Sequence, residues 1–237
     1  MTDNDIFDHE NIFEDDFLSS KMSLENELSK VTQLLQEKDF DSIEEVNEFL
    51  NNHLKGGSTP PRKNSSNKEQ AQDLLYEAFE ATGMKRKKLA EKALTLYPNS
   101  PDANNILAEF EEDPEELLVM GMRAGEQELG KKYFKENKGY FWGLIETRPY
   151  MRVKFNYASF LQDVGREEGA IFHYKELIEL NPSDNQGVRF ELFVAYVEEE
   201  MLEEAKGLLE EYNESHTTRD NFNRVLSNFY KMALRKR

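Results

Sequence analysis

The sequence predicts an all-α protein in which short helices pair into hairpins that repeat along most of the chain. From Glu69 to the C-terminus, apolar residues recur three and four positions apart, which is the spacing of amphipathic helices. No alternation of apolar and polar residues is long enough to predict a β-strand. Glycine or proline interrupts the helical pattern repeatedly, as expected where turns join helices; the breaks lie near Gly83, Pro98, Pro114, Gly139, Pro149, Gly165 and Pro182.

Four segments of the chain differ in composition. Residues 1–20 hold seven acidic residues, several large apolar residues and no lysine or arginine, which is typical of a disordered acidic tail. Such a tail either solubilises a protein or docks onto a partner. Residues 21–54 predict a small helical hairpin. Residues 55–68, rich in glycine, proline, serine and asparagine, predict a flexible linker, and residues 69–237 predict the helical-repeat domain.

The composition excludes several classes of function. The formal net charge of −17 disfavours nucleic acid and anionic membranes and favours a partner with a basic face. The chain has no cysteine, so it has no disulfide framework and no thiolate metal site. It also lacks an apolar run of about 18 residues, and its first residues are acidic where a secretory signal is basic. We therefore expect a cytoplasmic protein without a cofactor.

The clearest repeat unit runs from Met151 to Pro182, MRVKFNYASFLQDVGREEGAIFHYKELIELNP. Small residues at Ala158 and Ala170 allow two antiparallel helices to approach closely, with the turn at Gly165–Arg166. Tyr174 is an aromatic residue that fills the space toward the next hairpin, and Pro182 ends the second helix. This pattern resembles the tetratricopeptide repeat of 34 residues.

Two further segments resemble the same repeat. The unit NQGVRFELFVAYVEEEMLEEAKGLLEEY follows with an offset of one residue, and KRKKLAEKALTLYPNSPDANNILAEF resembles a second helix, a proline and a new first helix. The stretches GMRAGEQELGKKYFKENKGYFWGLIETRPYMR and LNPSDNQGVR are similar to bacterial relatives of the suppressor-of-tumorigenicity tetratricopeptide family, over about residues 70–212. That family implies helical-hairpin repeats and no established enzyme chemistry. It supplies no ligand.

The resemblance also implies a binding face, because the first helix of each tetratricopeptide hairpin lines a concave groove. The positions that it implies in the first unit are Arg152, Phe155, Ser159, Gln162 and Asp163. Those in the next unit are Phe190, Val194, Val197 and Glu198. Such a mixture of apolar and charged positions suits an extended or helical peptide, although the apolar members are equally compatible with a core between repeats. The predicted function is therefore a non-enzymatic adaptor that binds a protein or peptide.

Residues 139–152, GYFWGLIETRPYMR, concentrate aromatic and charged side chains and include the only tryptophan, Trp142. Pro149 is suited to the first turn of the following helix. Arg148 and Arg152 are four residues apart, so they form an anion clamp for a free carboxylate if they share a helix face. The alternative is structural: the aromatic residues fill space between repeats, and the arginines pair with Glu126 or Glu146.

Two other functions remain open. The repeats can act as a peptide sensor whose output module is the N-terminal hairpin beyond the flexible linker. A hydrolase would use Glu126 and Glu146 as a carboxylate pair, but their spacing does not support such a pair. The four histidines, His9, His53, His173 and His216, include no pair with the spacing of metal ligands.

Overall fold

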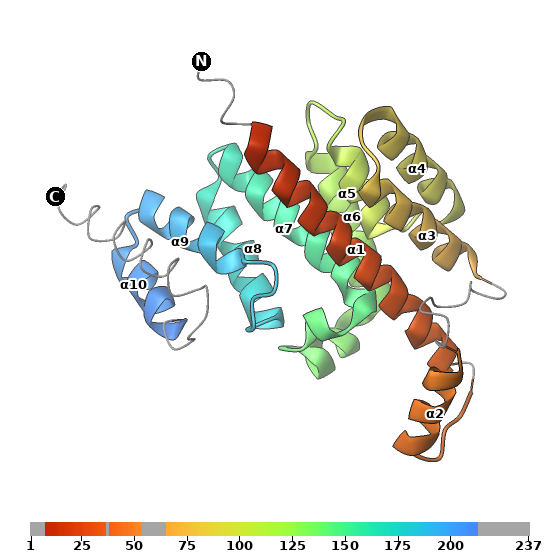
Figure 1. Cartoon of the computed structure of the whole chain (residues 1–237). Helices are drawn as coiled ribbons and strands as arrows, with labels where there is room; N and C mark the ends of the chain where they lie inside the picture. The colour runs from red at the N-terminus through yellow and green to blue at the C-terminus, as the bar shows by residue number, and fades with distance from the viewer. Residues whose placement is uncertain (1–7, 37, 54–64, 213–237) are drawn as a thin grey trace. The chain divides into compact units, whose positions relative to one another are not determined.

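The computed structural model describes residues 8–36, 38–53 and 65–212, and these residues form helices joined by turns, without a β-strand (Figure 1). The chain divides into two compact units, Met1–Leu117 and Leu118–Arg237. This division falls inside the segment 69–237 that the sequence analysis treats as one domain. No helix in the described part of the chain combines the length and apolar character needed to cross a membrane.

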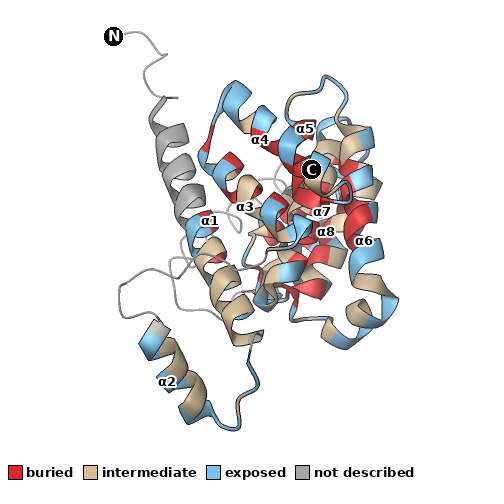
Figure 2. Cartoon of the chain, turned by 90° about the vertical axis from the view of Figure 1, so that its right-hand side faces the viewer, coloured by how far each residue is buried: buried red, intermediate tan, exposed pale blue. Residues whose placement is uncertain are grey.

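The first unit is built around three consecutive helices: α3 (Asn67–Glu80), α4 (Gly83–Leu96) and α5 (Pro101–Ala108). Each packs against the next, and α3 also packs against α1 (Asp8–Gln36). Their contacts are made by small and aliphatic side chains, and Figure 2 shows buried positions on all three helices. The fully buried members of this core include Ala71, Leu75, Ala78, Ala90, Ala93, Ala103 and Ile106.

The ends of these helices follow from local sequence. Ser66 accepts a hydrogen bond from the backbone N–H of Glu69, whose carboxylate accepts from the Ser66 N–H, which is a capping box. Ser100 caps α5 by accepting a hydrogen bond from the Ala103 N–H, and Pro101 opens that helix. Helix α3 thus begins at Asn67, so the last two residues of the predicted linker are helical. Most of that linker lies outside the described residues.

The N-terminal region differs from its prediction. Helix α1 begins at Asp8, so residues 8–20 are helical instead of a disordered tail. The reason is visible in the sequence, because apolar residues at positions 13, 17, 24, 28, 31 and 35 continue one helical spacing through the acidic stretch. Helix α2 (Ile43–His53) follows α1, so the structure has two successive helices over the segment 21–54 where the sequence predicts a small hairpin.

The second unit contains the segment in which the sequence predicts its clearest pair of repeats. It consists of most of α6 (Glu115–Asn137), the short turns η2 (Phe141–Gly143) and η3 (Ile145–Thr147), and the helices α7 (Arg148–Asp163), α8 (Glu167–Leu180), α9 (Val188–Glu198) and α10 (Leu202–Glu211). Consecutive helices from α7 to α10 pack against one another, and α7 also contacts α9. This packing is that of a helical-repeat array.

The predicted turns and small residues occupy their expected places in the second unit. Pro149 is in the first turn of α7, and Gly165 has a φ of 71°, a left-handed conformation that suits the turn before α8. Ala158, Ala170 and Tyr174 are fully buried. Close packing of α7 on α8 therefore has the physical origin that the sequence predicts.

The loop between α8 and α9 is fixed by one buried carboxylate. Asp184 accepts from the backbone N–H groups of Val188 at 2.7 Å and Arg189 at 3.3 Å, and it also pairs with the Arg189 side chain. The guanidinium of Arg189 lies over the rings of Phe190 and Tyr212. Burial raises the pKa of Asp184, whereas these hydrogen bonds oppose the rise. Within the stretch LNPSDNQGVR, Asp184 thus satisfies the first two backbone N–H groups of α9.

Candidate functional site

The candidate site is the surface that α7 and α9 share in the second unit. We call it the α7–α9 face. It comprises the nine positions that the repeat register predicts together with Glu191: Arg152, Phe155, Ser159, Gln162, Asp163, Phe190, Glu191, Val194, Val197 and Glu198. All ten side chains are half-buried or exposed, and Asp163, Val194 and Glu198 are exposed. The intervening residues of both helices, such as Ala158 and Phe193, are buried. Each helix therefore turns the predicted positions away from its core.

Gln162 links three helices at the centre of this face. Its side-chain N–H donates to Glu198 of α9 at 3.0 Å, and its carbonyl oxygen lies 3.2 Å from the hydroxyl of Tyr174 on α8. That hydroxyl is also 3.2 Å from the Ser159 hydroxyl oxygen and donates to one of the two acceptors at a time. Polar side chains on this face are therefore held in place by hydrogen bonds within the protein.

Tyr174 supports the face from beneath. Its ring is fully buried and lies 6.0 Å from the ring of Phe155, centroid to centroid. Burial raises the pKa of Tyr174 to about 12, so its hydroxyl remains protonated at neutral pH. From the sequence, Tyr174 was predicted only to fill the space toward the next hairpin. Its hydrogen bonds to the face depend on the rotation of α8 against α7, which the spacing of residues does not reveal.

Carboxylates surround the apolar centre of the face. Glu191 is half-buried, and its pKa is raised first by that burial and then by the charges of Asp163 and Glu198. Val194, which is 40% exposed, lies one helical turn from both Glu191 and Glu198 on α9. The face is therefore negative and partly apolar, and a cation placed there relieves the repulsion among its carboxylates. Glu191 was not among the positions of this face predicted from the sequence. Its spacing of three residues from Val194 and seven from Glu198 could have placed it there.

The aromatic–arginine stretch 139–152 is built as a turn, with Arg148 as part of its structure. The Arg148 guanidinium stacks on the Trp142 ring at 5.1 Å and donates to the Trp142 carbonyl at 3.0 Å. The buried hydroxyl of Thr147 bonds to the carbonyls of Phe141 and Leu144. Trp142 and Arg148 thus hold each other and the two short turns, while Arg152 lies on the α7–α9 face.

The aromatic residues of this stretch do not all fill space between helices. Phe141 and Tyr150 are buried, as the structural reading predicts, but Tyr140 is 76% exposed. The reason is that Tyr140 precedes the η2 turn, which directs the following Phe141 inward beside Phe134. The prediction that Tyr140 plugs the core is therefore wrong.

Glu126 and Glu146 each bond to a tyrosine. Glu126 accepts from the Tyr150 hydroxyl at 3.5 Å, and Glu146 accepts from the Tyr133 hydroxyl at 2.8 Å. Burial and the Glu146 hydrogen bond raise the pKa of Tyr133 to about 12. Each carboxylate therefore serves a separate tyrosine, which is a structural use of both groups.

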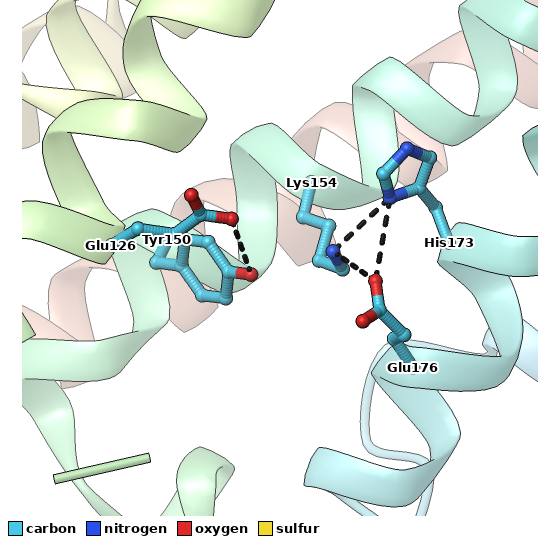
Figure 3. A network of polar contacts seen from close by, with 5 residues as sticks. All are labelled: Glu126, Tyr150, Lys154, His173 and Glu176. Carbon is cyan, nitrogen blue, oxygen red and sulfur yellow. Dashed lines mark hydrogen bonds and ion pairs between the residues drawn. The ribbon is translucent and has the colours of Figure 1, made fainter. Parts of the chain in front are cut away.

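A buried lysine network joins α7 to α8 (Figure 3). Lys154 is 3% exposed, and its ammonium donates to Glu176 at 2.7 Å and lies 3.1 Å from the Nδ1 of His173. The Tyr150 ring lies 5.6 Å from the same ammonium. Hydrogen bonds from His173 and Lys154 lower the pKa of Glu176 to about 2. This network is not evident from the sequence, because no spacing pattern relates a lysine on one helix to a His–Glu pair at i, i+3 on the next.

The geometry of the Lys154 network is suited to holding helices together. Each charged atom already has a partner of opposite or polar character, as a buried cation requires. Among the residues that the structure describes, no three His, Cys, Asp or Glu side chains gather closely enough to hold a metal ion.

No protein-family model, curated protein or solved structure matches this chain.

Proposed function

We propose that this protein is a non-enzymatic adaptor that binds a segment of another protein on its α7–α9 face, and that α7 to α10 are two tetratricopeptide-type repeats. The observation that carries the proposal is the mixed character of that face. Half-buried Phe155 and exposed Val194 offer apolar contact, and Gln162 offers an oriented amide beside the carboxylates. A protein segment can satisfy apolar and polar positions together along the length of two helices.

The charge of the face favours a basic segment. Asp163, Glu191 and Glu198 lie close enough to raise the pKa of Glu191, and the whole chain carries a net charge of −17. A lysine or arginine of the partner gains attraction from all three carboxylates and is drawn toward the protein from a distance. The proposed localisation is the cytoplasm, in line with the absence of cysteine.

An exchange of one exposed residue tests the adaptor function. Val194→Lys removes the apolar centre of the face and adds a like charge against a basic partner. Met120→Lys places the same side chain on α6, at an apolar residue of similar exposure. Proteins retained by immobilised wild-type chain from the native host are compared with those retained by each variant. We expect the partner to be lost with Val194→Lys only, and equal retention by both variants contradicts the proposal.

Arg152 separates a binding role from a structural role at the end of the face. If it contacts the partner, Arg152→Ala weakens binding about tenfold or more and leaves the melting temperature nearly unchanged. If it is a structural cation, the same change lowers stability, by about 3–5 kcal/mol for a buried pair. Thermal unfolding and partner titration on this one variant distinguish the two roles.

A peptide sensor with an N-terminal output module is the second candidate, and helix α1 supplies the observation that favours it. Met22 and Glu25 of α1 are buried, with Glu25 accepting from Tyr76 of α3 at 3.4 Å, whereas Leu24 and Leu28 are exposed. Those leucines offer an apolar surface to a downstream protein. Leu24→Ser with Leu28→Ser should then remove the biological output and leave partner binding at the α7–α9 face intact, and unchanged output argues against the sensor.

A further inference from the structure

Helix α4 carries a stripe of lysines that is unusual in so acidic a chain. Its sequence GMKRKKLAEKALTL holds five cations, at Lys85, Arg86, Lys87, Lys88 and Lys92, against one carboxylate, at Glu91. Lys85, Lys88 and Lys92 are spaced three and four residues apart, so they share one side of the helix. All three are exposed, and Met84, 63% exposed, lies one turn before Lys88. We call these four residues the α4 stripe.

The neighbouring cations of α4 have structural roles that the α4 stripe lacks. Arg86 donates to Glu109 at 2.6 Å and reaches the Ala78 and Phe79 carbonyls at the end of α3. Lys87 pairs with Glu111 at 3.6 Å. In the described part of the chain, no ion pair of 4.0 Å or less involves the three lysines of the stripe. Two of the five cations therefore hold the first unit together, and three face solvent.

The position of the stripe opposes the local preferences of a helix. Lys85 and Lys88 fall in the first two turns of α4, where the helix dipole favours acidic residues and disfavours cations. The N-cap residue, Thr82, makes no side-chain hydrogen bond to the helix, and the first turn holds no acidic residue. A sequence that departs from local stability rules without a compensating internal contact commonly does so at a functional site.

We propose that the α4 stripe docks an acidic protein segment that also carries apolar side chains. The charges are complementary, because carboxylates gain attraction from three unneutralised lysines and from the N-terminal end of the helix. Met84 is an adaptable apolar contact for a leucine or phenylalanine of the segment. This surface lies in the first unit and favours the opposite charge from the α7–α9 face in the second unit, so each surface has its own test.

The size of the stripe favours a peptide over nucleic acid. From Lys85 to Lys92 the helix rises about 10 Å at 1.5 Å per residue, which matches a few charges of an extended or helical segment. Nucleic-acid binding commonly neutralises about 6–10 phosphates, and the remainder of this chain repels a long polyanion. An exposed methionine adds nothing to phosphate contacts, whereas it packs well against apolar side chains.

A charge-reversal pair tests the docking surface in the full chain. The probe is a fluorescent synthetic peptide in which glutamates and aspartates alternate with leucine and phenylalanine, and a second peptide has glutamine and asparagine in place of the acids. Lys85→Glu/Lys88→Glu is compared with Lys131→Glu/Lys175→Glu, an equal change of charge at exposed lysines of the second unit. Fluorescence anisotropy gives the dissociation constants, and thermal unfolding reports the fold.

We expect the wild-type chain to bind the acidic peptide and not its neutral counterpart. Lys85→Glu/Lys88→Glu should weaken that binding about tenfold or more, with a melting temperature that is equal or higher because acids suit the start of a helix. The control pair should bind within about twofold of the wild type, and Val194→Lys should change nothing. Equal weakening by both pairs, no binding of the acidic peptide, or tighter binding of single-stranded DNA or anionic vesicles overturns the proposal.

Discussion

Replacing Ala170 with leucine tests the close packing of α7 on α8. Ala170 has no exposed surface and lies on α8, which packs against both α7 and α9. Leucine adds three carbon atoms where no space faces solvent, so neighbouring side chains or the helices themselves must move. Overpacking of this kind typically destabilises a protein by about 1–3 kcal/mol. We expect the melting temperature to fall by several degrees.

Two further substitutions make the Ala170 experiment decisive. Ala170→Gly should also destabilise, by about 1 kcal/mol or more, because it loses helix propensity and a buried methyl group. Lys175→Leu adds leucine at an exposed position of the same helix and should change stability by less than about 0.5 kcal/mol. If Ala170→Leu melts like the wild type within error, the position is not a close helix crossing and the repeat register is incorrect.

Three other predictions follow from contacts in the second unit. A Cβ atom added at Gly125 would lie 2.9 Å from two Tyr150 atoms, whereas one added at Gly207 would meet nothing within 4 Å. Gly207→Ala should therefore raise the free energy of unfolding by about 0.5–1 kcal/mol. Gly125→Ala should leave that free energy unchanged or lower it. The carboxylate of Glu176, with its pKa lowered to about 2, contributes stability that is present above its unfolded pKa and lost as pH falls from about 4.5 through about 2. Tyr174→Phe should cost about 1 kcal/mol, because it removes the hydroxyl that donates to Ser159 or Gln162.

Each of these three predictions has a direct measurement. Chemical unfolding should give a higher free energy of unfolding than the wild type for Gly207→Ala, and an equal or lower one for Gly125→Ala. Glu176→Gln should be less stable than the wild type at pH 6 by about 1 kcal/mol, since partial exposure screens the pair, and the difference should shrink at pH 2. Glu168→Gln, an exposed control on α8, should show no such convergence. Chemical unfolding of Tyr174→Phe measures its loss of stability, and absorbance titration of the same variant should lose one tyrosine that ionises near pH 12.

Local spacing in the sequence determines much of this fold. The turn at Gly165, the place of Pro149 in the first turn of α7 and the small Ala158 and Ala170 between helices were all predicted, because each depends on residues only a few positions apart. The α4 and α5 helices on either side of Pro98 were equally visible. The acidic stretch before Lys21 was predicted to be disordered because of its charge, although its apolar residues continue the helical spacing. In the structure α1 begins at Asp8.

The tertiary structure alone decided which side chains meet across helices. Helical spacing shows that His173 and Glu176 share a side of α8, but only the rotation of α8 against α7 brings the Lys154 ammonium to 2.7 Å from Glu176. The same rotation places Gln162 between Tyr174 and Glu198. Contacts between helices depend on crossing angle and axial shift, which are set by the packing of whole faces. The sequence by itself therefore determined the helices, their small-residue contacts and most positions of the α7–α9 face, and the packing of those helices decided the polar networks that join them.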